Sequence, residues 1–111
     1  MDDRIAAGRF AALAHPTRLS VFRRLMQAGP DGLAAGVLAE ALDVAPNNLS
    51  AHLNTMSQAG LIEARREGRS RIYVVRMETT AATVGFLIED CCQGHPDICD
   101  VVTRQPEPVG I

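Results

Sequence analysis

Three cysteines stand within nine residues near the C-terminal end of the sequence. Cys91 and Cys92 are adjacent, and Cys99 follows after six intervening residues. Adjacent side chains on a helix point about 100° apart, so two neighbouring thiols converge on one ion only where the helix ends. Gly94 and Pro96 supply that ending, and closing so short a loop costs little entropy. The pattern indicates a three-sulfur site for a soft ion.

The coordination chemistry of three thiols ranks the ions that such a site would take. Trivalent arsenic or antimony binds three sulfurs in a pyramid and needs no fourth ligand, whereas Zn²⁺ and Cd²⁺ usually take four. His95 would offer a fourth ligand, and nearby carboxylates would attract a dication. Arsenic(III) is the first expectation, with antimony(III), cadmium, lead and zinc as alternatives, and no catalytic cofactor is expected.

The same cysteines permit hypotheses other than ion binding. A helix C-terminus and four carboxylates disfavour reactive thiolates, namely Glu89, Asp90, Asp97 and Asp100. A disulfide between Cys91 and Cys92 is disfavoured because their Cα atoms are only about 3.80 Å apart. A Cys92–Cys99 disulfide stays possible, and the cysteines also suit a buried helix end. A thiol enzyme is disfavoured, because no Cys-x-x-Cys pair is present, so the chain is expected not to be an enzyme.

A second set of residues has the chemistry of nucleic-acid binding. One face of a predicted helix over residues 46–60 is polar and uncharged, and Asn side chains pair well with adenine edges in a major groove. The face comprises Asn47, Asn48, Ser50, Ala51 and Asn54, with His52 toward the edge of the apolar face. A predicted hairpin follows and carries Arg65, Arg66, Arg69 and Arg71, which suit phosphates or a minor groove.

The elements that position these residues follow from apolar spacing and from Gly and Pro. Helices are expected up to residue 14, from residue 16 to the 29–32 turn, over 36–42, over 46–60 and from 78 to about 92, and strands over 61–65 and 71–75. This is a mainly α fold with a small β-hairpin, arranged as a winged helix-turn-helix. Residues 1–100 form one domain and 101–111 a flexible tail.

The last predicted helix is apolar nearly all round, which a surface helix would not be. In a chain of 111 residues, the second covering surface is most simply another copy of the chain. The sequence therefore predicts a homodimer. The expected interface residues are Phe10, Leu13, Val84, Phe86, Leu87 and Ile88.

The net charge of −2 hides a division along the chain. Residues 1–77 hold ten arginines against seven carboxylates, net +3, and residues 78–111 hold one against six, net −5. The basic part is expected to face double-stranded DNA and the acidic part to have another task. No segment is long and apolar enough for a membrane span, and no signal peptide is evident, so a cytoplasmic protein without a membrane partner is expected.

Several motifs in order resemble the ArsR family of winged-helix repressors. They are residues 13–19 (LAHPTRL), 49–53 (LSAHL), 58–62 (QAGLI) and 65–69 (RREGR). The resemblance implies a dimeric transcriptional repressor that leaves its operator when an inducer binds. The family's founding arsenic sensors carry Cys-x-Cys before the recognition helix, which is absent here, but some arsenic-responsive members are similar in having three C-terminal cysteines. Ala45 stands where the family often has a capping Ser, and the loss of this cap is expected to weaken the start of the recognition helix.

Overall fold

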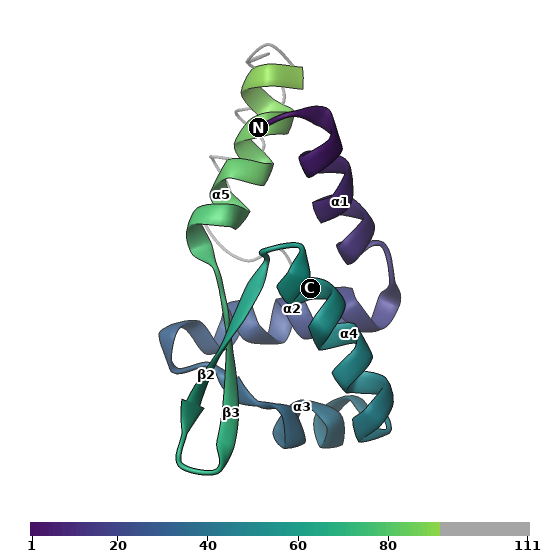
Figure 1. Cartoon of the computed structure of the whole chain (residues 1–111), viewed down its shortest axis with the longest axis vertical. Helices are drawn as coiled ribbons and strands as arrows, with labels where there is room; N and C mark the ends of the chain where they lie inside the picture. The colour runs from purple at the N-terminus through teal and green to yellow at the C-terminus, as the bar shows by residue number, and fades with distance from the viewer. Residues whose placement is uncertain (92–111) are drawn as a thin grey trace.

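The computed structural model describes the backbone of residues 1–91 and the side chains of residues 1–88 (Figure 1). The elements are α1 (Asp3–Leu13), α2 (Pro16–Ala28), a 3₁₀ turn η1 (Gly29–Asp31), β1 (Leu33–Ala34), α3 (Ala35–Leu42), α4 (Pro46–Gln58), β2 (Ile62–Glu67), β3 (Ser70–Val75), α5 (Met77–Gly85) and a π-helical segment η2 (Phe86–Cys91). This order confirms the predicted winged helix-turn-helix class. The proposed tail over 101–111 lies outside the described residues. None of the described helices combines the length and apolar character needed to cross a bilayer.

Short-range signals begin and end the helices as predicted. Pro16 occupies the first turn of α2, and His15 caps that helix by accepting a hydrogen bond from the backbone N–H of Thr17 at 3.1 Å. Gly60 takes φ +80° just after α4, and the N–H of Leu61 donates to the carbonyl oxygen of Met56 at 3.1 Å. This is the C′ glycine that the sequence predicts.

The sheet corrects the predicted two-stranded hairpin. A third strand, β1, pairs antiparallel with β3, so the order is β1-β3-β2. Gly32 precedes it at φ +66°, where a Cβ would collide with the carbonyl oxygen of Tyr73. The strand was missed because two residues are too short for an alternating pattern.

Two predicted boundaries were wrong. The turn expected over 66–70 contains only Gly68 and Arg69, because Glu67 and Ser70 still pair. Gly68 takes φ +63° at the first turn position, which suits a tight two-residue hairpin. The last helix is regular only to Gly85 and continues as the π-helical η2, a change that apolar periodicity does not reveal.

The core lies between α2, α3, α4 and the sheet. Its largest fully buried side chains are Val21, Leu25, Leu38, Leu49, Leu53, Met56, Leu61 and Ile62. The other two helices, α1 and α5, extend away from this body (Figure 1). They are joined by a hydrogen bond that Arg9 Nη1 donates to Thr83 Oγ1 at 3.4 Å. The molecule therefore has a body, formed by α2, α3, α4 and the sheet, and a two-helix extension, formed by α1 and α5 with η2.

Candidate nucleic-acid interface

Helix α4 presents one buried face and one exposed polar face. Leu49, Leu53 and Met56 repeat at spacings of four and three and are at most 1% exposed. The opposite face is solvent-exposed and contains Asn47, Asn48, Ser50, Ala51 and Asn54. The amphipathic division predicted from the sequence is confirmed, and it leaves amide and hydroxyl groups free to meet base edges.

The start of α4 lacks a side-chain cap. Ala45 is the N-cap residue, and no side-chain hydrogen bond satisfies the first backbone N–H groups of the helix. Pro46 compensates in part, because it has no N–H to satisfy and its φ suits a first turn. The open helix N-terminus carries a partial positive charge next to Asn47.

His52 is half-buried and hydrogen-bonded within the protein. Arg18 Nη1 lies 3.2 Å from His52 Nδ1, and the rings of His15 and His52 have centroids 4.4 Å apart. A guanidinium can only donate, so Nδ1 accepts and the ring proton is on Nε2. Burial first, then the charges of His15 and Arg18, lower the pKa of His52 below 6.5. His52 is therefore held neutral and directed toward α2 as much as toward solvent.

Arg18 connects this helix to α1. Its Nε donates to the carbonyl oxygen of Ala12 at 2.6 Å and its Nη2 to that of Ala11 at 3.4 Å, where α1 ends. The carbonyl oxygen of Ala11 also accepts from the backbone N–H of Ala14, so the guanidinium adds to the capping of the C-terminal end of α1 while it holds His52. Arg18 is a functional candidate that no spacing rule singles out.

The wing places alternate side chains on opposite faces. Ile62, Ala64 and Arg66 share one face of β2, directly across from Val75, Tyr73 and Arg71 of β3. Arg66 and Arg71 are thus direct cross-strand partners of like charge. Like charges in this arrangement repel unless an anion lies between them. In the described part of the chain the one ion pair is Arg65–Glu67, so neither arginine of this pair has a carboxylate partner there.

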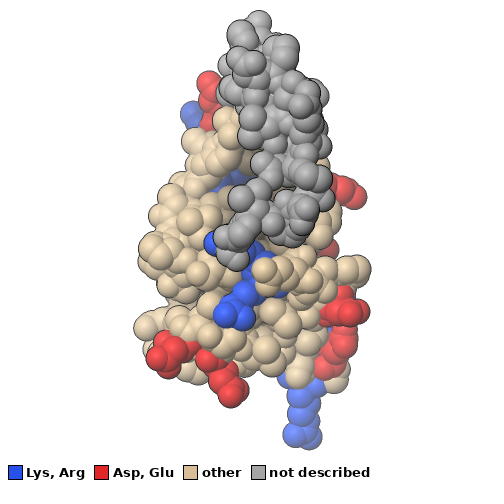
Figure 2. All heavy atoms as spheres, turned by 180° about the vertical axis from the view of Figure 1, so that it is seen from behind, with Lys and Arg blue, Asp and Glu red and all other residues tan. Residues whose placement is uncertain are grey.

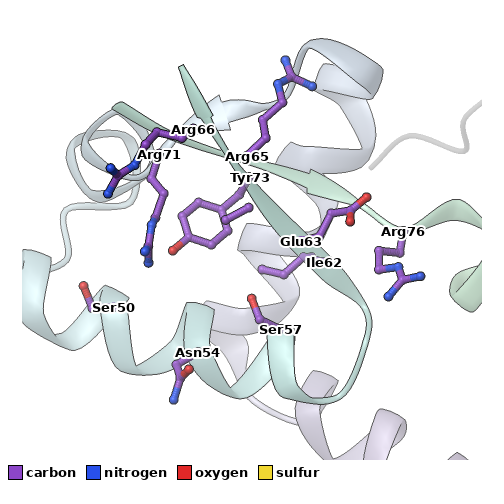
Figure 3. A pocket seen from close by; sticks show the side chains of 11 residues that line it. Ser50, Asn54, Ser57, Ile62, Glu63, Arg65, Arg66, Arg71, Tyr73 and Arg76 are labelled. Atoms are coloured by element: carbon purple, nitrogen blue, oxygen red, sulfur yellow. The ribbon is translucent and has the colours of Figure 1, made fainter. Parts of the chain in front are cut away.

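A groove lies between the wing and α4 (Figure 3). Its volume is about 540 Å³, and its walls include Ser50, Asn54 and Ser57 of α4. Figure 3 shows Arg71 extending from the wing toward Ser50, with the hydroxyl of Tyr73 directed into the space. The groove joins hydrogen-bonding groups on a helix to cations on a hairpin, which is the arrangement that DNA bases and phosphates require.

Ser57 and Tyr73 line the groove although neither was among the predicted site residues, and so do Ile62, Glu63 and Ala64 of β2. The sequence predicts Tyr73 only as a strand residue. Its side chain reaches the groove because Tyr73 pairs with Ala64, and both lie on the face of the wing that carries Arg66 and Arg71. Arg76, which the sequence places near the basic hairpin, lies just before α5 and also lines the groove.

The four predicted wing arginines divide into different environments. Arg66 and Arg71 border the groove, and Arg69 is exposed in the turn beside Gly68. Figure 2 shows basic side chains projecting beyond the body at the end of the wing. Arg65 also lines the groove, but in Figure 3 its guanidinium is directed away from α4, and it bonds within the protein. The sequence could not separate these roles, because all four have the same chemistry.

The predicted thiol site lies outside the described side chains. Cys91 is the last residue of η2, and Cys92, His95 and Cys99 follow beyond the described residues. Among the described residues, no three His, Cys, Asp or Glu side chains come together to hold a metal ion. The thiol site stays a prediction.

Several known proteins similar to this chain are named as regulators of transcription. A family model described as a helix-turn-helix domain matches residues 13–65. An uncharacterised HTH-type transcriptional regulator of Bacillus subtilis, YceK, is 32% identical over 87 residues, covering 78% of this chain and 86% of YceK. The nodulation protein NolR of Rhizobium meliloti is 28% identical over 105 residues, 95% of this chain and 80% of NolR. A putative arsenical resistance operon repressor of Halobacterium salinarum is 34% identical over 79 residues, 71% and 60% of the two chains.

Solved structures agree in fold. The crystal structure of an ArsR family transcriptional regulator has a TM-score of 0.71 at 27% identity, covering 84% of this chain and 93% of the other. The homodimeric winged helix-turn-helix DNA-binding domain Mb0332 of Mycobacterium bovis has a TM-score of 0.63 at 26% identity, covering 86% and 90%. These similarities show the winged helix-turn-helix fold of a transcriptional regulator.

Proposed function

The chain belongs to the ArsR family of winged-helix transcriptional regulators, and from this premise we propose that it is a homodimeric repressor that trivalent arsenic or antimony releases from operator DNA. DNA binding rests on one observation above the others. Arg66 and Arg71 face each other across the wing without a carboxylate partner among the described residues and border the exposed polar face of α4. A phosphate is the group that relieves this repulsion, and it sets the helix in a major groove.

The support for a homodimer is an exposed apolar surface on α1 and on the last helical segment. Ile5 is 48% exposed, and Val84 and Leu87 are each 41% exposed. The other expected interface residues, Phe10, Leu13, Phe86 and Ile88, are half-buried. Apolar surface of this kind typically marks an interface, and the similar domain Mb0332 is homodimeric. A two-fold dimer would present two α4 helices to successive major grooves about 34 Å apart.

The support for arsenic is the chemistry of Cys91, Cys92 and Cys99 and their place in the chain. Cys91 ends η2, which continues α5 and carries the proposed interface residues Phe86 and Leu87. A ligand drawing the thiols together would therefore act on dimer geometry. A coupling of about 1–3 kcal/mol would weaken operator binding 5- to 150-fold.

The alternatives use the same cysteines with different chemistry. Cadmium, lead or zinc would recruit His95 as a further ligand and would be attracted by the nearby acidic side chains. Oxidation to a Cys92–Cys99 disulfide would make a redox-responsive repressor. Each alternative keeps the DNA-binding surface and changes only the signal.

The test is an electrophoretic mobility shift of DNA from upstream of the protein's own gene, with and without arsenite. We expect retardation by the wild-type protein, loss of retardation with arsenite, and no arsenite response in Cys91→Ser, Cys92→Ser and Cys99→Ser. Arsenate, which does not condense directly with thiols, is the matched control anion. If the protein retards no DNA from this region, the operator proposal is overturned. If all three variants still respond fully to arsenite, the thiol site is overturned.

Parallel titrations separate the alternative signals. Antimonite, Cd²⁺, Pb²⁺ and Zn²⁺ are added to the same protein–DNA complex, and the ion with the lowest half-maximal concentration is the effector. Diamide followed by dithiothreitol tests the redox alternative. Release by diamide and recovery with dithiothreitol, without a response to arsenite, would replace the arsenic proposal.

A further inference from the structure

Neighbouring arginines on β2 lie on opposite faces of the wing. Arg66 shares its face with Arg71 and Tyr73, next to α4. Arg65 lies directly across from Ile72, so the strand alternation puts it on the other face. In Figure 3 its guanidinium is directed away from α4. Two adjacent residues of the same type are thus available for different tasks.

The guanidinium of Arg65 uses all three of its nitrogens within the protein. Nε donates to Glu67 Oε2 at 2.6 Å, Nη1 to the carbonyl oxygen of Pro30 at 2.8 Å, and Nη2 to that of Asp31 at 3.0 Å. The two carbonyls belong to η1, a short turn whose last carbonyls have few internal partners. Three of the five N–H donors of this guanidinium are thus used within the protein, and they hold it on the side of the wing away from α4.

These contacts link segments that the backbone does not pair. In the sheet order β1-β3-β2, β3 separates β2 from β1, and η1 comes just before β1. Arg65 therefore joins the outer strand of the wing to the segment on the far side of β3. Gly32, at φ +66° beside Tyr73, lets η1 and β1 approach β3 closely enough for this contact.

We propose that Arg65 is a positioning residue of the DNA-binding surface, which braces the wing against η1 so that Arg66 and Arg71 face Ser50 and Asn54 of α4. The inference rests on the proposed DNA binding for its consequence, but the brace itself exists without DNA. Strand β1 pairs only with Ile72 and Tyr73, so the outer part of the wing, with Arg66 and Arg71, is two-stranded. A two-stranded hairpin alone is marginally stable in water, so an unbraced wing would have to be ordered when DNA binds. Loss of the brace weakens binding without removing a phosphate contact.

The first measurement needs no DNA. The sequence has one tyrosine and no tryptophan, so intrinsic fluorescence reports on Tyr73 of the wing alone. We expect greater acrylamide quenching and lower anisotropy of Tyr73 in Arg65→Ala, and wild-type values in the control variant Arg69→Ala, which removes an exposed arginine of the turn that does not line the groove. Circular dichroism of both variants controls for global unfolding. Equal Tyr73 signals in wild type and Arg65→Ala overturn the brace, whatever happens with DNA.

The second measurement is the salt dependence of DNA affinity, on the upstream duplex or on any duplex that the wild type binds. Arg66→Ala should lower the slope of log K against log salt by about one unit per wing, because a phosphate contact is lost. Arg65→Ala should bind roughly 3- to 10-fold more weakly with an unchanged slope, since ordering a few side chains and backbone torsions has a modest free-energy cost. Arg65→Lys keeps the charge but not the forked geometry, so its loss should approach that of alanine.

The outcomes separate the two proposals. A reduced slope in Arg65→Ala, with near wild-type binding in Arg65→Lys, makes Arg65 a phosphate ligand and overturns the brace. If the wild type binds no duplex while Arg65→Ala still loosens Tyr73, the brace stands and the DNA-binding proposal fails. An unchanged affinity and slope in Arg65→Ala overturn the functional role of the brace.

Discussion

The body that carries α4 and the wing differs from the α1–α5 extension in how each buries its apolar side chains. In the body, Leu25, Leu49, Leu53 and Met56 are at most 1% exposed and pack against one another. In the extension, the buried residues are small or polar, namely Ala6, Ala12 and Thr83. None of its large apolar side chains among the described residues is fully buried: Ile5, Val84 and Leu87 are exposed, and Phe10, Leu13, Phe86 and Ile88 are half-buried.

The two regions therefore have different sources of stability. The body contains a complete core, so its recognition surface does not depend on a partner for its shape. The extension exposes apolar surface that a single copy of the chain does not cover. A second copy bound there would set the geometry of the extension and the spacing between the two bodies of the dimer. A signal received in the extension can thus act on DNA binding without rebuilding α4.

The largest expected effect comes from breaking the core of the body. Leu53→Ala should lower the free energy of unfolding by about 2–5 kcal/mol, because it leaves a cavity in a tightly packed core. Leu87→Ala, the same change at an exposed position of the extension, should lower it by less than about 1 kcal/mol in dilute protein. Urea denaturation followed by circular dichroism measures both. Equal losses would mean that the two regions do not differ as described.

A charge in the extension should break the proposed dimer rather than the fold. Leu87→Asp places an unpaired carboxylate in the expected interface, so we predict a monomer in sedimentation velocity and DNA binding weakened at least about 100-fold. Met26→Asp is the matched control, because Met26 is 40% exposed on α2, against 41% for Leu87. The control should keep the wild-type sedimentation coefficient. A dimer in Leu87→Asp would move the interface elsewhere.

A smaller gain is expected where the body lacks a cap. Ala45→Ser supplies an acceptor for the first N–H groups of α4 and should raise the free energy of unfolding by about 0.5–2 kcal/mol. Ala45→Val adds a side chain without an acceptor and should give no such gain. Thermal melts of the two variants and the wild type make the comparison. Stabilisation by both would argue for packing at residue 45 instead of capping.

The smallest effect is expected in the pH dependence of stability, through His52, whose partner Arg18 joins the body to the end of α1. The pKa of His52 is lowered on folding, so the unfolded chain binds more protons, and stability falls as the pH drops below about 6.5 until it passes the folded-state pKa. His52→Gln keeps an acceptor for Arg18 but does not titrate. Urea midpoints between about pH 7.5 and 5.5 should change less in this variant than in wild type. Parallel curves would show that His52 does not contribute to the pH dependence.

Local patterns were sufficient for most of the elements. The i, i+4, i+7 spacing of Leu49, Leu53 and Met56 predicts α4 and its buried face, and Pro46 and Gly60 predict its ends. The two-residue β1 was missed, because its pairing with β3 comes from contact between distant segments and not from a pattern within it. The change to η2 was missed for a similar reason, since a π-helical turn keeps the same apolar composition.

The candidate site was predicted by residue type more accurately than by role. The polar face of α4 and the basic wing were identified from composition and order alone. The structure divides the wing arginines by strand parity and contact, with Arg66 and Arg71 at the groove and Arg65 on η1. It also adds Tyr73 and Ser57 to the groove, and it gives His52 a partner in Arg18.

The helix-turn-helix, the polar face of α4, the basic wing and the cluster of three cysteines follow from the order of residues, because all of these depend on spacing along one chain. The fold adds which arginines face the groove, what holds the wing, and the link by which Arg18 joins the end of α1 to His52. These features depend on distances between segments far apart in sequence, such as the 2.8 Å from Arg65 Nη1 to the carbonyl oxygen of Pro30. Chain folding sets such distances, and residue type alone does not.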